Sequence, residues 1–456
     1  MSSTYQPNPT TPDLSILQPE FRDFIANFPD TIETAQTADV VVKFMRSIPP
    51  RPHNDPRITK QDVQVSSPNA SLTQPPVNVR IYSPVGVDSA RPLPVLLWMH
   101  HGGFFSAGPR RLDPFCSAIA ADANIVVVAP AYRQTPENPF PAPFDDCYQV
   151  LQWLLTSPEI ARYAIDNTRL AIGGSSVGGT LAFGLALRER LDRVETGTVH
   201  PLIRLLILDD TSFTDAPNTY STRHNPINKI WNANVTRYSW QLYLPNGADA
   251  LDPATQAYVV PARATDLTGL PPTLVLCAQW DDLTDDAVAF AGHLLQVGVP
   301  TEIHTYRGTF HVSDKLLPNA TSSIRKRQDI VNALLATHHM REEYNTTKLQ
   351  RAAANIQRVR ALSRLISENK EGTPAALRGV SKRRAQDPTR TERIRFGAHH
   401  GEMKFGVRRD RAALPHAGRH HDREAPGQSY KFQRRPTGER IKNQKHSYQI
   451  IGSNTD

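Results

Sequence analysis

The sequence predicts an α/β protein in which helices cover both faces of a mostly parallel sheet. First, residues 93–100 and 124–132 are near-continuous apolar runs of strand length, as expected of strands that are buried on both sides. Second, residues 144–157 and 284–298 carry helical patterns and lie between such runs. Because the two kinds of segment alternate along the chain, a parallel sheet with crossover helices is favoured.

The individual elements follow in chain order. Residues 17–28 place Phe21, Phe24, Ile25 and Phe28 on one stripe, which predicts an amphipathic helix that must lie on another surface. Residues 77–84 alternate apolar and polar side chains like a half-buried strand. The further predicted strands are 93–100, 124–132, 169–174, 202–210, 272–280 and 301–310.

Residues 211–260 interrupt this alternation. They are polar and rich in Asn and aromatic residues, and they lie between two predicted strands. Connections longer than about 12–15 residues without secondary structure are uncommon and often functional. We therefore expect a cap over the edge of the sheet, formed by about residues 1–60 and 211–260.

The charge is divided unevenly along the chain, whose formal net charge is +8. Residues 341–456 hold 26 Lys and Arg against 12 Asp and Glu, whereas the remainder holds 26 against 32. Continuous apolar runs also stop near residue 340. The sequence thus predicts a folded domain over 1–340 and a basic, disordered extension over 341–456, in which a basic amphipathic helix at 349–366 is the alternative. No base-reading motif accompanies the charge, so specific nucleic-acid binding is not expected.

Compartment and redox state can also be inferred from the sequence. The first residues lack a basic segment followed by an apolar one, and no apolar run reaches the length of a membrane span. Cys116, Cys147 and Cys277 are widely spaced, which favours buried free thiols over a disulfide framework or a metal site. We expect a cytoplasmic protein without a transmembrane segment; its oligomeric state is not predicted.

A glycine-rich run, "GGSSVGG" at 173–179, joins a predicted strand to a predicted helix. Within it, residues 174–178 fit Gly-x-Ser-x-Gly, in which small residues permit a sharp turn that presents the central hydroxyl. Ser176 is therefore a candidate nucleophile with an exposed side chain.

Two further polar groups follow other predicted strands. Asp281 comes at the end of 272–280, and His311 at the end of 301–310. Carboxyl ends of parallel strands are where ligand sites gather in such sheets. Serine, acid and histidine thus occur in the chain order expected of a nucleophile, an orienting acid and a general base.

Residues 15–338 resemble the hormone-sensitive-lipase-like branch of the α/β-hydrolases. The similar segments are "HHGGFF", "AYRQTPENPFPAPFDD", "GGSSVGG", "YVVPARATDLTGLPPTLV", "DDLTDD" and "YRGTFH". The resemblance implies Ser176 as nucleophile, His311 as general base and Asp281 as the acid that orients it. It also implies an oxyanion hole formed by the backbone N–H groups of Gly102, Gly103 and Val177.

Some assignments have alternatives. Asp282, Asp285 and Asp286 compete with Asp281, and Asp285 is the first alternative for the acid. His101 stands where the family has the first loop glycine, and a register shifted by one residue would place Phe104 at the third glycine. We prefer the register that starts at His100. His100, Arg133 and Glu137 are expected to be structural, and Ala131 replaces an acid that is common in the family.

The resemblance implies a serine carboxylesterase that acts through an acyl-enzyme, without a metal ion or an organic cofactor. The expected substrates are short-acyl esters of small apolar molecules, such as the acetyl ester of a secondary metabolite or xenobiotic. Two alternatives use the same scaffold: a non-catalytic small-molecule receptor, and an enzyme that deacetylates amides or catalyses elimination.

Overall fold

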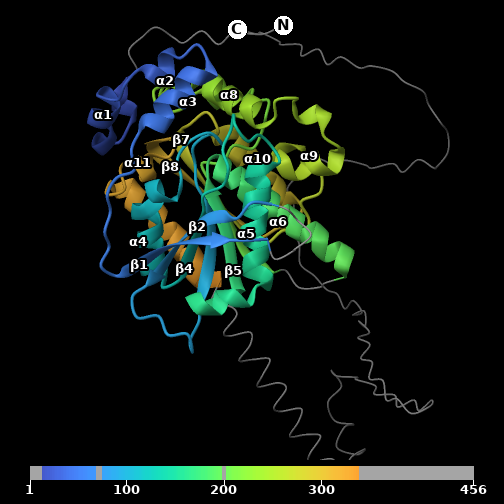
Figure 1. The fold of residues 1–456 in the computed structure, drawn as a ribbon. Helices are drawn as coiled ribbons and strands as arrows, with labels where there is room; N and C mark the ends of the chain where they lie inside the picture. The colour runs from blue at the N-terminus through green and yellow to red at the C-terminus, as the bar shows by residue number, and fades with distance from the viewer. Residues whose placement is uncertain (1–12, 68–73, 198–201, 338–456) are drawn as a thin grey trace, which may run out of the picture. The chain divides into compact units, whose positions relative to one another are not determined.

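The computed structural model describes residues 13–67, 74–197 and 202–337, in which eight strands form one sheet (Figure 1). The strands are β1 (Ile58–Val65), β2 (Val77–Pro84), β3 (Leu93–Met99), β4 (Val126–Pro130), β5 (Ile165–Ser175), β6 (Ile203–Asp209), β7 (Thr273–Trp280) and β8 (Thr301–Phe310). Their spatial order is β1-β2-β4-β3-β5-β6-β7-β8. β2 is antiparallel to both of its neighbours, and β3 to β8 are mutually parallel, so their carboxyl ends meet at one edge.

The predicted fold class and its strands are confirmed, but the sequence analysis missed the edge strand β1. Only its two terminal residues, Ile58 and Val65, are buried. The residues between them are mostly polar and at least partly exposed, so neither an apolar run nor a regular alternation marks the strand. β1 pairs along its whole length with β2, and this pairing defines it.

Helices cover both faces of the sheet. The helices are α1 (Pro19–Ala26), α2 (Thr31–Thr34), α3 (Ala38–Ser47), α4 (Asp113–Ala123), α5 (Ala142–Thr156), α6 (Val177–Thr196), α7 (Tyr220–His224), α8 (Ala233–Tyr243), α9 (Pro253–Val259), α10 (Thr284–Gln296) and α11 (Ser313–Leu316). Residues 321–337 are also helical. α5, α6 and α10 share a core with one face of the sheet, whereas α4 and helix 321–337 pack against the other.

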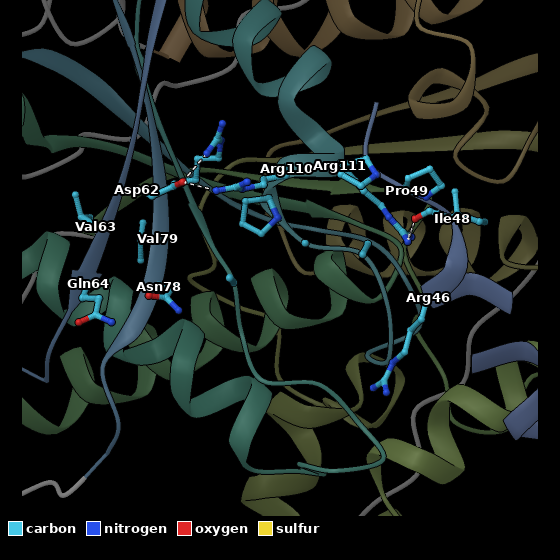
Figure 2. A pocket seen from close by; sticks show the side chains of 16 residues that line it. Arg46, Ile48, Pro49, Asp62, Val63, Gln64, Asn78, Val79, Arg110 and Arg111 are labelled. Atoms are coloured by element: carbon cyan, nitrogen blue, oxygen red, sulfur yellow. Dashed lines mark hydrogen bonds and ion pairs between the residues drawn. The ribbon is translucent and has the colours of Figure 1, made fainter. Parts of the chain in front are cut away.

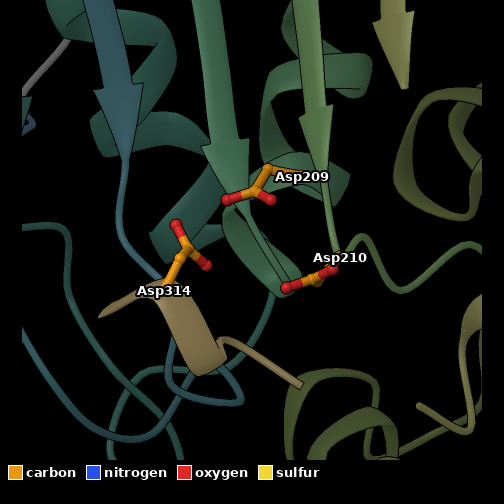
Figure 3. Close-up of side chains that lie close together, drawn as sticks. All are labelled: Asp209, Asp210 and Asp314. Atoms are coloured by element: carbon orange, nitrogen blue, oxygen red, sulfur yellow. The ribbon is translucent and has the colours of Figure 1, made fainter. Parts of the chain in front are cut away.

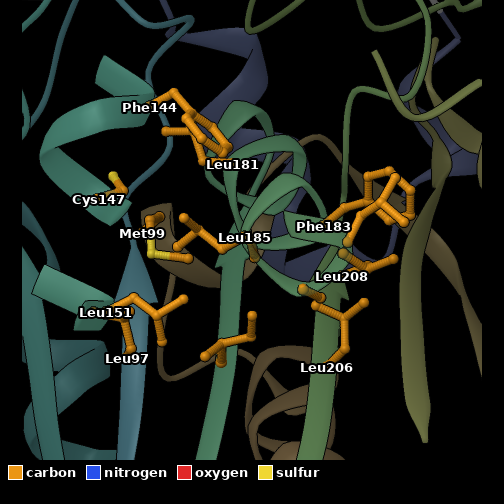
Figure 4. Packing of buried hydrophobic residues seen from close by; sticks show 14 of the residues in the cluster. Leu97, Met99, Phe144, Cys147, Leu151, Leu181, Phe183, Leu185, Leu206 and Leu208 are labelled. Atoms are coloured by element: carbon orange, nitrogen blue, oxygen red, sulfur yellow. The ribbon is translucent and has the colours of Figure 1, made fainter. Parts of the chain in front are cut away.

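Buried apolar side chains join these layers. On one face, Leu97 and Met99 of β3 belong to the same cluster as Leu181 and Leu185 of α6 and Cys147 of α5 (Figure 4). Full burial of a side chain of this size contributes about 1.5–3 kcal/mol.

On the opposite face, Trp98 of β3 packs against Phe115 of α4, with ring centroids 4.8 Å apart. Ile330 and Leu334 of helix 321–337 complete that cluster. The alternating side chains of β3 therefore serve two cores, which fixes its register in the middle of the sheet.

Two segments far apart in sequence lie side by side above the carboxyl ends of the strands (Figure 1). Phe21 and Ile25 of α1 share a cluster with Ile227, Ile230 and Phe310. In a second cluster, α2 and α3 meet Trp231 and α8. The apolar stripe predicted at 17–28 thus packs on the end of β8 and on the inserted segment.

Other features of the chain concern its thiols and its ends. Cys116, Cys147 and Cys277 are free and buried, as predicted. Among the described helices, none has the length and apolar character needed to cross a membrane. The predicted extension 341–456, including the candidate helix at 349–366, lies outside the described residues.

Candidate active site

The glycine-rich run forms a tight joint between β5, which ends at Ser175, and α6, which begins at Val177. Ser176 between them has φ 57° and ψ −127°, a backbone conformation that is uncommon for a residue with a side chain. A Cβ atom at Gly178 would approach the carbonyl oxygen of His100 to 2.6 Å. Glycine at 178 therefore allows α6 to begin directly against the end of β3.

The structure brings Ser176, His311 and Asp281 together at the ends of β5, β8 and β7. Nε2 of His311 lies 3.1 Å from Oγ of Ser176. Nδ1 of His311 lies 2.7 Å from Oδ2 of Asp281. Each pair is within the hydrogen-bond reach required of a nucleophile, a base and the group that orients the base.

Electrostatics favour the charged form of this histidine. Burial lowers the pKa of His311, whereas the Asp281 carboxylate and its hydrogen bond raise it. The raising effects are larger together, so the pKa lies above its ordinary value. The imidazolium that forms when His311 accepts a proton is thus stabilised by the carboxylate behind it.

The other aspartates of the same loop have different contacts. Oδ2 of Asp285 accepts a hydrogen bond from the N–H of Ser221 at 2.9 Å. Asp286 is partly buried in the first turn of α10, and burial raises its pKa to about 6. Oδ2 of Asp282 accepts a bond from Oγ1 of Thr236 at 2.7 Å. Among the four acids of residues 281–286, Asp281 is the one hydrogen-bonded to His311.

The loop after β3 has a backbone that requires its glycines. Gly102 and Gly103 have φ values of 116° and 63°. A Cβ atom at Gly102 would also lie 2.8 Å from the carbonyl carbon of Ser106. The N–H groups of Gly102, Gly103 and Val177 bond no described backbone acceptor. These N–H groups are therefore available to a ligand.

Phe104 belongs to the wall behind this loop. Its ring stacks on that of Tyr243 with centroids 3.8 Å apart, and it is fully buried. This position suits the register in which Gly102 and Gly103 are the donor glycines and Phe104 takes the aromatic place.

The two histidines of the loop differ in their surroundings. His100 is buried, stacks on Tyr132 at 4.0 Å, and directs Nδ1 to the carbonyl oxygen of His101 at 2.7 Å. Burial lowers the pKa of His100 to about 4, so it is neutral at neutral pH. His101 lines a cavity beside His311, and its Nδ1 has no partner among the described residues.

We expect His101→Gly to keep or raise the rate of the ester hydrolysis that the family resemblance implies. Glycine would return conformational freedom to the loop that carries Gly102 and Gly103, and it would remove a buried nitrogen without a partner. The check is kcat/KM for a small ester together with the melting temperature. A large fall in kcat/KM at unchanged melting temperature would mean that the imidazole itself contributes to the reaction.

The expectation that the Ser176 side chain is exposed is wrong. Ser176 is 0 % exposed and His311 is 4 % exposed. The indole of Trp231 lies over the imidazole of His311 with ring centroids 5.1 Å apart, and this part of the chain precedes α8. The sequence motif defines the turn but cannot show what covers it, because the covering residues come from distant segments.

A cavity of about 100 Å³ borders His311 under these covering segments. Its apolar lining comes from the N-terminal helices and the inserted segment, and includes Phe28, Met45, Ile230 and Trp231. Gly102 and His311 line it from the sheet side. The space beside His311 is therefore small, and Ser176 is not among the residues that line it.

The inserted segment is hydrogen-bonded to the loop that carries Asp281. Nε1 of Trp231 donates to Oγ1 of Thr236 at 2.8 Å, and Thr236 in turn donates to Asp282. Burial and the neighbouring Asp281 charge raise the pKa of Asp282 well above its ordinary value. Sequence reasoning did not identify Thr236 or Trp231, because nothing local connects residues 231–236 to residue 282.

A buried ion cluster contacts the loop that carries His311, and Figure 3 shows its three aspartates. Asp209, Asp210 and Asp314 surround the ammonium groups of Lys315 and Lys326. Oδ2 of Asp210 also accepts from the N–H of Val312 at 3.0 Å, directly after His311. The carboxylate oxygens would be close enough to share a cation, but the two ammonium groups already bind them. We therefore assign this cluster to support of the His311 loop rather than to a metal ion.

The residues expected to be structural lie in ion pairs. Arg133 bonds Asp146 at 2.7 Å, and Glu137 bonds Arg46 at 2.7 Å. Ala131, in place of an acid, donates its N–H to the carbonyl of Asn78 at 2.8 Å. These contacts tie the segment after β4 to its neighbours.

Comparison with known proteins gives a consistent result. Residues 96–314 match the sequence profile of the α/β-hydrolase fold family. Carboxylesterase NlhH of Mycobacterium tuberculosis is 30 % identical over 308 residues, which are 66 % of this chain and 91 % of that protein. Ethyl acetate hydrolase of Pseudomonas putida is 32 % identical over 233 residues, which are 51 % of this chain and 70 % of that protein.

The solved structure of a bacterial heroin esterase is similar to this chain with a TM-score of 0.58 and 30 % sequence identity. The match covers 71 % of this chain and 98 % of that structure.

Proposed function

Because this chain belongs to the α/β-hydrolases, in their hormone-sensitive-lipase-like branch, and is a serine hydrolase of carboxylic esters, we propose that it cleaves short-acyl esters of small, largely apolar molecules through an acyl-enzyme. The hydrogen-bonded series from Ser176 through His311 to Asp281, at 3.1 Å and 2.7 Å, is the observation that carries this proposal.

In the proposed acylation step, Oγ of Ser176 attacks the ester carbonyl carbon while Nε2 of His311 accepts the hydroxyl proton. Asp281 accepts the Nδ1–H of His311 and stabilises the resulting imidazolium. The N–H groups of Gly102, Gly103 and Val177 would donate hydrogen bonds to the carbonyl oxygen and stabilise its negative charge. The tetrahedral intermediate then collapses, the bond to the alcohol breaks, and His311 returns the proton to the leaving oxygen.

Deacylation repeats these steps with water. His311 accepts a proton from a water molecule, whose oxygen attacks the acyl carbon, and the proton then passes to Oγ of Ser176 as the carboxylic acid leaves. One ester and one water molecule are consumed, and one alcohol and one acid are formed.

A short acyl chain is supported by the size of the site. The cavity beside His311 measures about 100 Å³ and has aromatic and aliphatic walls. The name of the Pseudomonas putida relative specifies ethyl acetate, which is an ester of a two-carbon acid. An acetyl ester is accordingly the substrate that we propose first.

The test of this proposal combines labelling with an acyl-chain series. We expect a fluorophosphonate probe to label the wild-type chain at Ser176 and to leave Ser176→Ala unlabelled. Chromogenic esters from acetyl to octanoyl should be hydrolysed with kcat/KM falling as the acyl chain grows. Wild-type protein that resists labelling and leaves all of these esters intact would contradict the proposal and favour a receptor on the same scaffold.

We also propose that the catalytic domain ends near residue 340. Helix 321–337 supplies Ile330 and Leu334 to the core, whereas the sequence after it lacks strand-length apolar runs. Truncation after residue 340 is expected to leave ester turnover and melting temperature nearly unchanged at both low and high salt. A several-fold loss of turnover in the truncated chain would place part of the working enzyme beyond residue 340.

A further inference from the structure

The charges that line the active-site cavity are all of one sign. Arg51, Arg111 and Lys315 are among its lining residues, and none of the described lining residues is an aspartate or a glutamate. Lys315 is neutralised, because its ammonium group pairs with Asp209 and Asp314. The two guanidinium groups have no such partner.

Carbonyl oxygens are the acceptors that these two arginines use. Nη1 of Arg51 donates to the carbonyl of Leu316 at 2.6 Å. Nη2 of Arg111 donates to the carbonyls of Met45, at 2.8 Å, and Ile48. Within the described chain, neither guanidinium forms an ion pair with a carboxylate, so the positive charge of each lacks a compensating acid and several of its five N–H donors remain available.

Arg111 has an uncommon environment for a cation without a counter-charge. It is half-buried, and burial lowers its pKa. It also lines a second cavity of about 650 Å³, which shares Ile48 and Pro49 with the cavity beside His311 (Figure 2). A desolvated guanidinium is destabilised unless an anion approaches it, and a carboxylate matches its planar fork of donors.

Other arginines around that second cavity are paired. Arg46 pairs with Glu137, Arg80 with Asp113, and Arg110 with Asp62. The lack of an acid at Arg111 is therefore a local property of the wall between the two cavities. Arg110, the adjacent residue, lines the larger cavity but is not among the residues that line the one beside His311.

We propose that the preferred ester carries a carboxylate group, which Arg111 binds with the help of Arg51 while the ester carbonyl lies at Ser176. This inference rests on the proposed function and narrows its substrate class to small esters with an apolar body and one anionic end. The apolar wall formed by Phe28, Met45 and Trp231 accommodates the body. The two arginines favour substrates that carry a negatively charged carboxylate.

The experiment compares two esters of the same shape, the acetyl ester of 3-hydroxybenzoate and the acetyl ester of 3-hydroxybenzamide. They share the acyl group and the ring, and differ in a carboxylate against a neutral amide. We expect wild-type kcat/KM to favour the carboxylate ester by about ten-fold or more, as for a charge-assisted hydrogen bond that replaces a neutral contact.

Arg111→Met is expected to lower this preference by about ten-fold, and Arg51→Met by less, because Arg51 is exposed to solvent. Arg111→Lys keeps the charge but loses the paired donors, so it should retain part of the preference. Arg110→Met is the matched control and should leave both rates unchanged. Because each variant is scored by the ratio of two esters, partial unfolding lowers both rates and leaves the ratio intact.

Equal rates for the two esters in the wild type would overturn the proposal, as would a slower rate for the carboxylate ester. A preference that falls as much in Arg110→Met as in Arg111→Met would also overturn it. If the amide ester is hydrolysed normally in these cases, the proposed esterase function stands and only the carboxylate site is wrong. If neither ester nor a chromogenic acetate is hydrolysed, the proposed function is wrong and the carboxylate site with it.

Discussion

Ser176→Ala is expected to lower kcat for ester hydrolysis by about 10⁴- to 10⁶-fold, the range seen when a serine nucleophile is removed from a site of this type. The variant keeps the Cβ atom and the backbone conformation of Ser176, whose N–H bonds the carbonyl of Asp209 at 2.8 Å. The melting temperature should therefore stay close to that of the wild type. The measurements are turnover of a chromogenic acetate and thermal unfolding by circular dichroism.

His311→Ala should show a loss of similar size, since the serine hydroxyl is a poor nucleophile without the base. A suitable control is His304→Ala, because His304 also belongs to β8 and pairs with Glu302. Turnover in Ser176→Ala that stays within ten-fold of the wild type would place the nucleophile at another residue.

Asp281→Asn is expected to lower kcat by about 10⁴-fold, because an amide in place of the carboxylate favours the wrong tautomer of the base. The 2.7 Å contact between Asp281 and Nδ1 of His311 is the interaction that would be changed. Asp282 is not expected to replace it, since its carboxyl group already accepts a hydrogen bond from the Thr236 hydroxyl and burial raises its pKa.

Asp285→Asn is the matched control for this prediction. Its carboxylate accepts the N–H of Ser221 and does not contact His311, so we expect a change of no more than a few-fold. Kinetics of both variants with one ester decide the assignment. An inactive Asp285→Asn variant together with a fully active Asp281→Asn variant would show that the orienting acid has been misassigned.

Local pattern explains which parts of this protein could be predicted from the sequence. Strands β3, β4, β6 and β7 and the second half of β5 are apolar runs in which almost every residue is buried, and such runs are visible in the sequence whatever surrounds them. The joint at Ser176 and the acid Asp281 follow directly after such strands, whereas His311 follows β8, an edge strand that is buried mainly at its end. Their proximity in space then follows from the parallel sheet, because the carboxyl ends of its strands share one edge.

Features that depend on distant partners could not be predicted in the same way. β1 is defined by pairing with β2 and has no apolar run of its own. The cover over Ser176 depends on how residues 227–231 meet the N-terminal helices. Lys326 is an ordinary lysine in the sequence, and its burial among Asp209, Asp210 and Asp314 depends on the position of the last helix.

The position of Lys326 bears on the order in which the protein can be completed during its synthesis. Asp209 and Asp210 leave the ribosome more than a hundred residues before Lys326, yet both are buried in the finished protein and both bond its ammonium group. Lys315 also pairs with Asp209, but Asp210 pairs with Lys326, and a buried carboxylate is strongly unfavourable without its cation. We therefore expect the nascent chain to keep the end of β6 and the His311 loop open until helix 321–337 emerges. The hydrolase would thus become active only after helix 321–337 has been synthesised, and its activity would not increase gradually as the chain lengthens.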